Sequence, residues 1–143
     1  MTPSGVRERM TTRPLVLVVE DDLGVRGPLE KFLRLHGLDV VSADGADAAL
    51  ERLTQRTVAA AVVDLRLSQG SGLEVILSIP PPTPVIIFSA VPDESGRLEQ
   101  MRPNTRLIQK PFSLLMLVET LQKMMDAAAR NDPATRRISA AAR

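Results

Sequence analysis

The chain has 143 residues, a length that is enough to bury the core of one domain. Its composition, 44% hydrophobic and 24% charged, is typical of a soluble globular protein. It contains no cysteine, which excludes disulfides, thiolate metal sites and thiol catalysis. The net charge of +1 arises at the chain ends, because residues 14–125 hold 11 basic and 14 acidic residues. A nucleic-acid surface would need a basic patch on this body, and its acidic balance argues against one.

Five apolar runs are predicted to form β-strands, and their starts lie roughly 20 to 25 residues apart, so that each gap has room for one helix. The predicted strands are Leu15–Val19, Val40–Ala43, Ala59–Val63, Val85–Phe88 and Arg106–Ile108. Residues 1–13 are predicted to form a flexible N-terminal extension, and residues 14–126 to form the folded domain.

A first helix is predicted between the first two strands, with Asp22 as its N-cap and His36-Gly37 at its end. Its apolar face consists of Val25, Leu29, Phe32 and Leu33. Gly24, Gly27 and Pro28 lie where this helix should begin, so its first turns are expected to be irregular.

The later gaps carry helix signals of different strength. Asp44 is the predicted N-cap of a second helix, and a short third helix should end at Pro80-Pro81-Pro82. A fourth helix, in the segment 92–105, is weakly predicted because the segment contains Gly96 and Pro103 and few apolar residues. The last helix follows Ser113, and residues 127–143 are expected to form its end and a disordered basic tail. The apolar face of the second helix is Ala46, Ala49, Leu50 and Leu53. That of the third is Leu73, Ile76 and Leu77. That of the last is Leu114, Leu117, Val118, Leu121 and Met125.

The alternation of strands and helices predicts an α/β fold with a doubly wound, five-stranded parallel sheet between two helical layers. Continuous apolar strands, without alternation of polar residues, are typical of a sheet that is covered on both faces. In such sheets, ligands bind at the carboxyl ends of the strands.

The residues at those strand ends form a candidate site. Strand one ends in Glu20-Asp21-Asp22, strand three in Asp64, strand four in Ser89 and strand five in Lys110. Several carboxylates at one edge repel one another unless a cation lies between them. A small number of hard oxygen ligands, with water completing the coordination shell, is typical of a Mg²⁺ site. Lys110 and Ser89 could hold the oxygens of an anion beside the metal. The set therefore predicts a site that accepts a phosphoryl group.

Four segments of the chain together resemble the receiver domain of bacterial response regulators. They are "VVEDD", "VVDL" with "GSGLEV" after it, "IIFSA" and "LIQKPF", in the family's order and spacing over residues 14 to about 125. The resemblance implies a flavodoxin-like sheet of strand order 2-1-3-4-5. It also implies a phosphorelay function, with a histidine kinase or a histidine phosphotransfer protein as the phosphoryl donor.

The resemblance implies a role for each matching residue. Asp64 would be the phosphoacceptor, with Lys110 and Ser89 on the phosphoryl oxygens. Asp21, Asp64 and the Arg66 backbone carbonyl would bind Mg²⁺, with Mn²⁺ as a substitute, and Glu20 would act through water. Ser89 and the residue at position 107 would form the switch, and Pro111 would follow a cis peptide bond.

Two residues depart from the family pattern. Ser68 stands where the family usually has proline, and Leu107 stands where it usually has tyrosine or phenylalanine. Only three aromatic residues occur in the chain, Phe32, Phe88 and Phe112, so no substitute for the missing ring is evident in the sequence near Leu107.

The sequence favours a stand-alone, non-enzymatic signalling domain that acts on a downstream protein and could form a homodimer. The alternatives are a receiver-like interaction module that does not use phosphate and a receiver piece of a larger hybrid kinase or regulator. A magnesium phosphohydrolase would need a second acid two residues after Asp64, where Arg66 stands. The longest apolar runs are too short to cross a membrane and no signal-peptide core precedes them, which predicts a cytoplasmic protein without membrane partners.

Overall fold

A computed structural model describes residues 13–90 and 99–131. Within them, five strands form one sheet: β1 (Leu15–Val19), β2 (Asp39–Ala43), β3 (Ala60–Asp64), β4 (Val85–Ser89) and β5 (Thr105–Gln109). The order is β2-β1-β3-β4-β5 and every neighbouring pair is parallel. The predicted doubly wound fold is thereby confirmed, although four of the five predicted strands differ from the observed ones by one residue at one or both ends.

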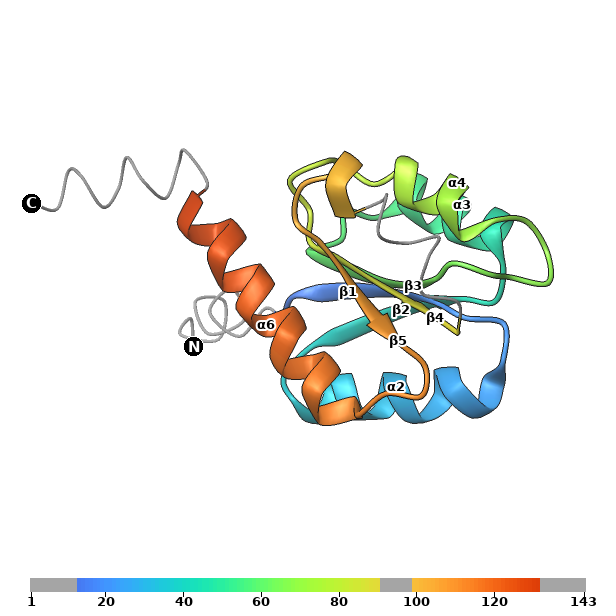
Figure 1. Ribbon diagram of the computed structural model, residues 1–143, viewed down its shortest axis with the longest axis horizontal. Coiled ribbons are helices and arrows are strands. Elements are labelled where there is room, and N and C mark those ends of the chain that lie inside the picture. The colour runs from blue at the N-terminus through green and yellow to red at the C-terminus, as the bar shows by residue number, and fades with distance from the viewer. Residues whose placement is uncertain (1–12, 91–98, 132–143) are drawn as a thin grey trace, which may run out of the picture.

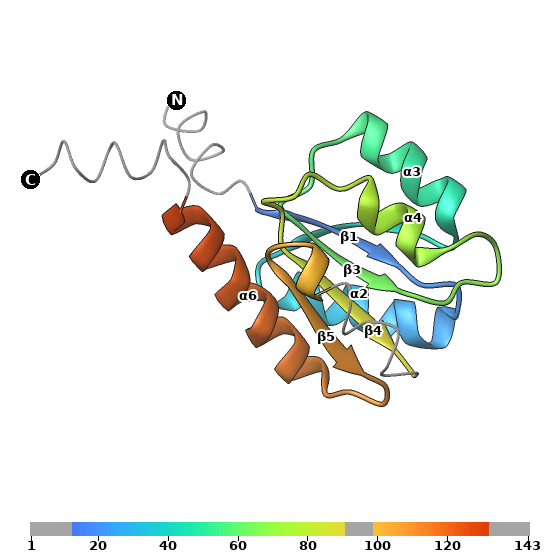
Figure 2. The same cartoon turned by 45° about the horizontal axis from the view of Figure 1, so that its top comes forward.

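The helices lie in two layers, one on each face of the sheet (Figure 1). They are α2 (Leu23–Leu35), α3 (Ala46–Gln55), α4 (Gly72–Leu77) and α6 (Leu114–Asn131). Figures 1 and 2 show α3 and α4 over one face, and α2 and α6 over the other. Among the described residues, no helix is both long and apolar enough to cross a membrane.

Each face of the sheet has its own core. Successive residues of a strand point to opposite faces, so Val16 and Val18 pack toward α2 and α6, while Leu17 and Val19 pack toward α3 and α4. All four are fully buried. This double burial explains why the strands are apolar at consecutive positions, and it holds the strand ends in a fixed register.

Helix α2 is regular from its first residue, so the expectation of irregular first turns was wrong. Asp22 is its N-cap, as predicted, and accepts a hydrogen bond from the Gly24 amide at 2.9 Å. Pro28 lies inside the helix and leaves only the Gly24 carbonyl without its helical donor; because Gly24 is exposed, water can satisfy that carbonyl. The helix ends at His36 as predicted, with Gly37 in the left-handed region at φ 87°.

Helix α3 contradicts the prediction that Asp44 is its N-cap. The N-cap is Gly45, which has no side-chain capping bond. The Ala46 amide instead donates to the main-chain carbonyl of Gln69, in the loop after β3, at 3.1 Å. A carbonyl from a distant loop therefore takes the place of a local capping side chain, and it ties this loop to the start of α3.

Several predicted features lie outside the described residues. These are residues 1–12 of the N-terminal extension, residues 91–98 of the weak fourth helix, and residues 132–143 of the tail. Residues 99–101 are helical, and α6 continues to Asn131. The domain boundaries at residues 13 and 126 stay a prediction.

Candidate functional site

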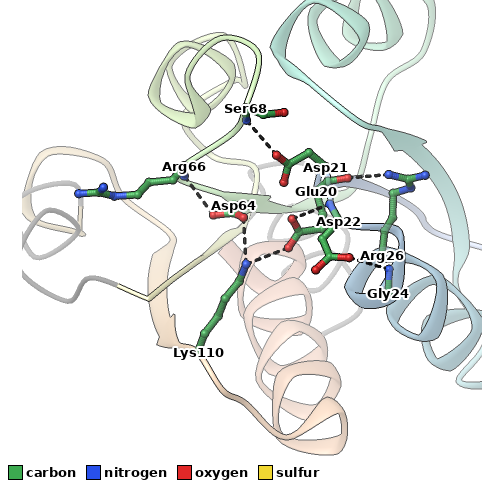
Figure 3. A network of polar contacts seen from close by, with 9 residues as sticks. All are labelled: Glu20, Asp21, Asp22, Gly24, Arg26, Asp64, Arg66, Ser68 and Lys110. Carbon is green, nitrogen blue, oxygen red and sulfur yellow. Dashed lines mark hydrogen bonds and ion pairs between the residues drawn. The ribbon is translucent and has the colours of Figure 1, made fainter.

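The polar residues of the predicted site meet at the carboxyl edge of the sheet. Glu20 and Asp21 follow β1, Asp64 is the last residue of β3, and Lys110 follows β5. Because all the strands are parallel and in register, these ends lie side by side although they are up to 90 residues apart in sequence. Figure 3 shows the side chains of these residues pointing toward one another.

Lys110 connects two of the carboxylates. Its Nζ lies 2.9 Å from Glu20 Oε1 and 2.9 Å from Asp64 Oδ2 (Figure 3). Glu20 is 1% exposed and Asp64 5% exposed, so both charges are withdrawn from water. The ammonium group offsets the cost of burying them, because an unpaired buried carboxylate would be strongly unfavourable.

Asp64 and Asp21 are also held by main-chain amides. Asp64 Oδ1 accepts from the Arg66 amide at 3.0 Å, and Asp21 Oδ2 accepts from the Ser68 amide at 2.9 Å. The loop after β3 therefore orients a carboxylate from β3 and one that follows β1. Ser68 can make this contact because, unlike the proline usual in the family, it has an amide hydrogen.

Three carboxylates are close enough to share one cation. One oxygen from each of Glu20, Asp21 and Asp64 lies within 4.8 Å of the others. Carboxylate oxygens are hard ligands of the kind that Mg²⁺ prefers. Among the described residues this is the group of acidic side chains that could hold a metal ion, and its three members are the acidic residues of the metal site predicted from the sequence.

The pKa values reflect this crowding. Burial raises the pKa of Glu20 to about 7, against the hydrogen bonds donated by Lys110 and the Asp22 amide. The hydrogen bond with Glu20, followed by those from Ser68, lowers the pKa of Asp21. Burial also opposes the charge of Lys110, but the hydrogen bonds and charges of Asp64 and Glu20 outweigh it and raise the Lys110 pKa.

The other predicted residues occupy the same edge or lie near it. Ser89 is the last residue of β4 and is 1% exposed; its carbonyl accepts from the Lys110 amide at 2.9 Å. The peptide bond between Lys110 and Pro111 is cis. Leu107 lies in β5, where it packs against the core under α3 and α4, and its amide donates to Glu99 Oε2 at 3.0 Å.

Two further contacts of this site were not predicted from the sequence. The Lys110 ammonium lies 4.8 Å from the centroid of the buried Phe88 ring, which is close enough for a cation–π interaction. Arg26 Nη1 donates to the main-chain carbonyl of Glu20 at 2.7 Å (Figure 3). The spacing of Arg26, four residues after the Asp22 cap, was the only sequence signal for the second contact, because a side chain in the first turns of a helix can reach back over its N-terminus.

The network predicts that Lys110→Met destabilises the metal-free protein in a pH-dependent way. The raised pKa of Glu20 means that ionised Glu20 disfavours folding, so this group's contribution to stability falls as pH rises from 4.5 to about 7. The Lys110 charge opposes that fall; its raised pKa keeps it protonated, and stabilising, throughout this range. We expect Lys110→Met to lower the free energy of unfolding by about 2 kcal/mol at pH 8 and by clearly less at pH 5.

Urea unfolding followed by circular dichroism at both pH values would measure this difference. Lys123→Met removes an exposed lysine of α6 and serves as the control, with little change expected at either pH. An equal loss of stability at pH 5 and pH 8 in Lys110→Met would show that the effect comes from packing and not from the buried carboxylates.

Comparison with known proteins gives one consistent result. The sequence model of the response regulator receiver domain matches residues 16–122. The transcriptional regulatory protein PrrA of Mycobacterium tuberculosis is 33% identical over 119 residues, which cover 80% of this chain and 51% of PrrA. The regulatory protein VirG of Agrobacterium fabrum is 30% identical over 115 residues, which cover 76% of this chain and 46% of VirG. The chain thus spans about half the length of these two regulators.

Solved structures agree with the sequence comparison. A response regulator receiver protein from Pseudomonas putida is 32% identical, with a TM-score of 0.68, over 78% of this chain and 98% of that protein. A CheY-like receiver domain protein from Methanospirillum hungatei has a TM-score of 0.77 over 83% of this chain and 98% of that one. At 19% identity, the second likeness supports the fold alone.

Proposed function

The chain belongs to the response regulator receiver domain family, and from this premise we propose that it accepts a phosphoryl group on Asp64. The observation that carries the proposal is the position of the Asp64 carboxylate. It lies at the end of the central strand, 2.9 Å from the Lys110 ammonium and within 4.8 Å of the carboxylate oxygens of Glu20 and Asp21. A nucleophile, a cation and a metal-ligating group thus meet at one point.

The residues present fit a divalent cation, and we propose Mg²⁺, with Mn²⁺ as a substitute. Asp21, Asp64 and the backbone carbonyl of Arg66 would bind it, and Glu20 would act through water. Only the carboxylates supply negative charge, and Lys110 neutralises it in part, so a cation has a clear electrostatic reason to bind. When bound, Mg²⁺ supplies charge neutralisation for the incoming phosphoryl oxygens.

In the proposed transfer, a carboxylate oxygen of Asp64 attacks the phosphorus of a phosphohistidine. The new O–P bond forms as the P–N bond breaks, and the electron pair of the P–N bond returns to the imidazole of the donor. Lys110 holds a phosphoryl oxygen, and the Ser89 hydroxyl donates to another. The Arg66 amide, 3.0 Å from Asp64 Oδ1, keeps the carboxylate oriented during the attack.

The proposed donors are a histidine kinase or a histidine phosphotransfer protein, and the proposed target is a downstream protein. A protein target is favoured because the body of the chain is acidic, with a net charge of −3 over residues 14–125. A cytoplasmic location belongs to the same proposal. Signalling proteins of this family are generally not enzymes, and the only chemistry we propose is the gain and loss of this phosphoryl group.

Intact-protein mass spectrometry after incubation with acetyl phosphate tests the proposal. We expect the mass of one phosphoryl group to be gained in the presence of Mg²⁺ and not in the presence of EDTA, because the carboxylate cluster needs a cation to receive an anion. Treatment with hydroxylamine should remove the added mass, since it cleaves acyl phosphates. No gain from acetyl phosphate or from a phosphohistidine protein would contradict the proposal and favour an interaction module that does not use phosphate.

A further inference from the structure

We propose that Arg26 is a positioning residue that fixes the metal-ligating turn between β1 and α2. This inference rests on the proposed function, because it concerns the affinity of the same site for Mg²⁺. The guanidinium of Arg26 touches none of the three carboxylates in the contacts described. It acts instead on the main chain that carries two of them, through the carbonyl of Glu20.

The contact is short and well anchored. Arg26 Nη1 lies 2.7 Å from the Glu20 carbonyl oxygen, and Arg26 Nε lies 3.3 Å from Glu30 Oε2. The side chains of Arg26 and Glu30 are 18% and 15% exposed, so the pair is largely shielded from water. Glu30 is held in turn by Arg34, at 3.6 Å. A planar guanidinium suits this role because it can donate in two directions at once.

The turn is restrained at Asp21 by the Ser68 amide and at Asp22 by the amides of α2, but fewer contacts hold the main chain at Glu20. The Glu20 amide donates to the Ala43 carbonyl at 3.1 Å, which continues the pairing with β2, and the Asp22 amide donates to Glu20 Oε2 at 3.1 Å. On the opposite side, the Glu20 carbonyl has Arg26 as its donor. Arg26 therefore restrains the peptide that joins Glu20 to Asp21, and it acts together with the Ser68 amide, which holds the Asp21 carboxylate itself.

The charge of Arg26 and its positioning role have opposite effects on Mg²⁺ binding. A positive charge near the site repels Mg²⁺. If Arg26 acted through its charge alone, its removal should therefore strengthen Mg²⁺ binding. Removing the restraint on Glu20 should weaken binding, because outer partners of metal ligands are worth about tenfold or more in affinity. The sign of the change therefore identifies the role.

Isothermal titration calorimetry with MgCl₂ on the whole chain would measure this sign. We expect Arg26→Met to bind Mg²⁺ about tenfold more weakly than the wild type. Arg26→Lys keeps the charge but cannot reach Glu20 and Glu30 together, so its affinity should fall between the two. Lys31→Met is the matched control: it removes a positive charge from an exposed position of the same helix, and no described hydrogen bond or ion pair joins Lys31 to Glu20 or Glu30, so its affinity should equal that of the wild type.

The outcomes separate this inference from the proposed function. Unchanged or stronger Mg²⁺ binding in a folded Arg26→Met would overturn the positioning role while leaving the proposed function intact. Absence of Mg²⁺ binding in the wild type would overturn the proposed function itself. If Arg26→Met fails to fold, Arg26→Lys decides: wild-type affinity in that variant would contradict the inference, since the simultaneous contacts of the guanidinium with Glu20 and Glu30 would then make no difference to the site.

Discussion

Asp64→Asn is expected to abolish the Mg²⁺-dependent gain of a phosphoryl group. The amide that replaces the carboxylate has nearly the same shape but is not a nucleophile toward phosphorus, and it lacks the charge that pairs with Lys110. Of the three clustered carboxylates, Asp64 alone lies in the middle of the sheet, between the ligands that follow β1 and the Lys110 that follows β5.

Intact-mass measurement with acetyl phosphate and Mg²⁺ would test this expectation in parallel with two other variants. Asp21→Asn keeps the nucleophile but loses a proposed metal ligand, so it should label more slowly and need more Mg²⁺. Asp44→Asn removes an exposed carboxylate just beyond the end of β2, and it should label like the wild type. Labelling of Asp64→Asn at the wild-type rate would place the phosphoryl group on another residue.

The sheet and the membership of the site could be predicted because both depend on short-range patterns. Continuous apolar strands indicate a sheet covered on both faces, and a parallel sheet brings its strand ends to one edge. Glu20, Asp64 and Lys110 each stand at such an end, so their meeting follows from the topology alone. The roles assigned to them by resemblance remain proposals.

Hydrogen bonds to particular main-chain carbonyls could not be predicted. Asp44 has the residue type of a helix cap, but the carbonyl of Gln69 already takes the first amide of α3. The sequence gives no indication of this, because the position of Gln69 depends on how the loop after β3 closes. A similar limit applies to Arg26: its spacing from the Asp22 cap allows it to reach back over the N-terminus of α2, but nothing in the sequence marks the Glu20 carbonyl as its partner.

Arg102 shows the limit most clearly. Arginine usually lies at the surface, yet this one is 6% exposed. Its guanidinium donates to the carbonyls of Pro80, Thr83 and Pro103 and to the Thr105 hydroxyl, at 2.7 to 3.0 Å. From the sequence, Pro80 marked only the end of the third helix, and Pro103 only weakened the prediction of the fourth. In the structure the carbonyls of both prolines accept hydrogen bonds from one buried arginine, which satisfies them.

Gly72→Ala is expected to lower the free energy of unfolding by about 3 kcal/mol, because the new methyl group has no space. A Cβ at Gly72 would lie 2.2 Å from the Asp64 carbonyl oxygen and 2.7 Å from Leu65 Cα. Both are main-chain atoms in the middle of the sheet edge, so neither can turn aside as a flexible side chain could. Either α4 must move away, which breaks the bond from the Gly72 amide to the Leu65 carbonyl, or Asp64 must move.

Gly27→Ala provides the matched control for this substitution. Gly27 lies inside α2, and a Cβ there would meet no atom within 4 Å. Alanine should therefore stabilise the helix by about 0.5 to 1 kcal/mol, through the lower backbone entropy of the unfolded chain. Urea unfolding followed by circular dichroism would compare the two variants. If Gly72→Ala were as stable as the wild type, the loop between β3 and α4 would have to be able to shift, and Asp64 would not be held as rigidly as its amide and ammonium contacts imply.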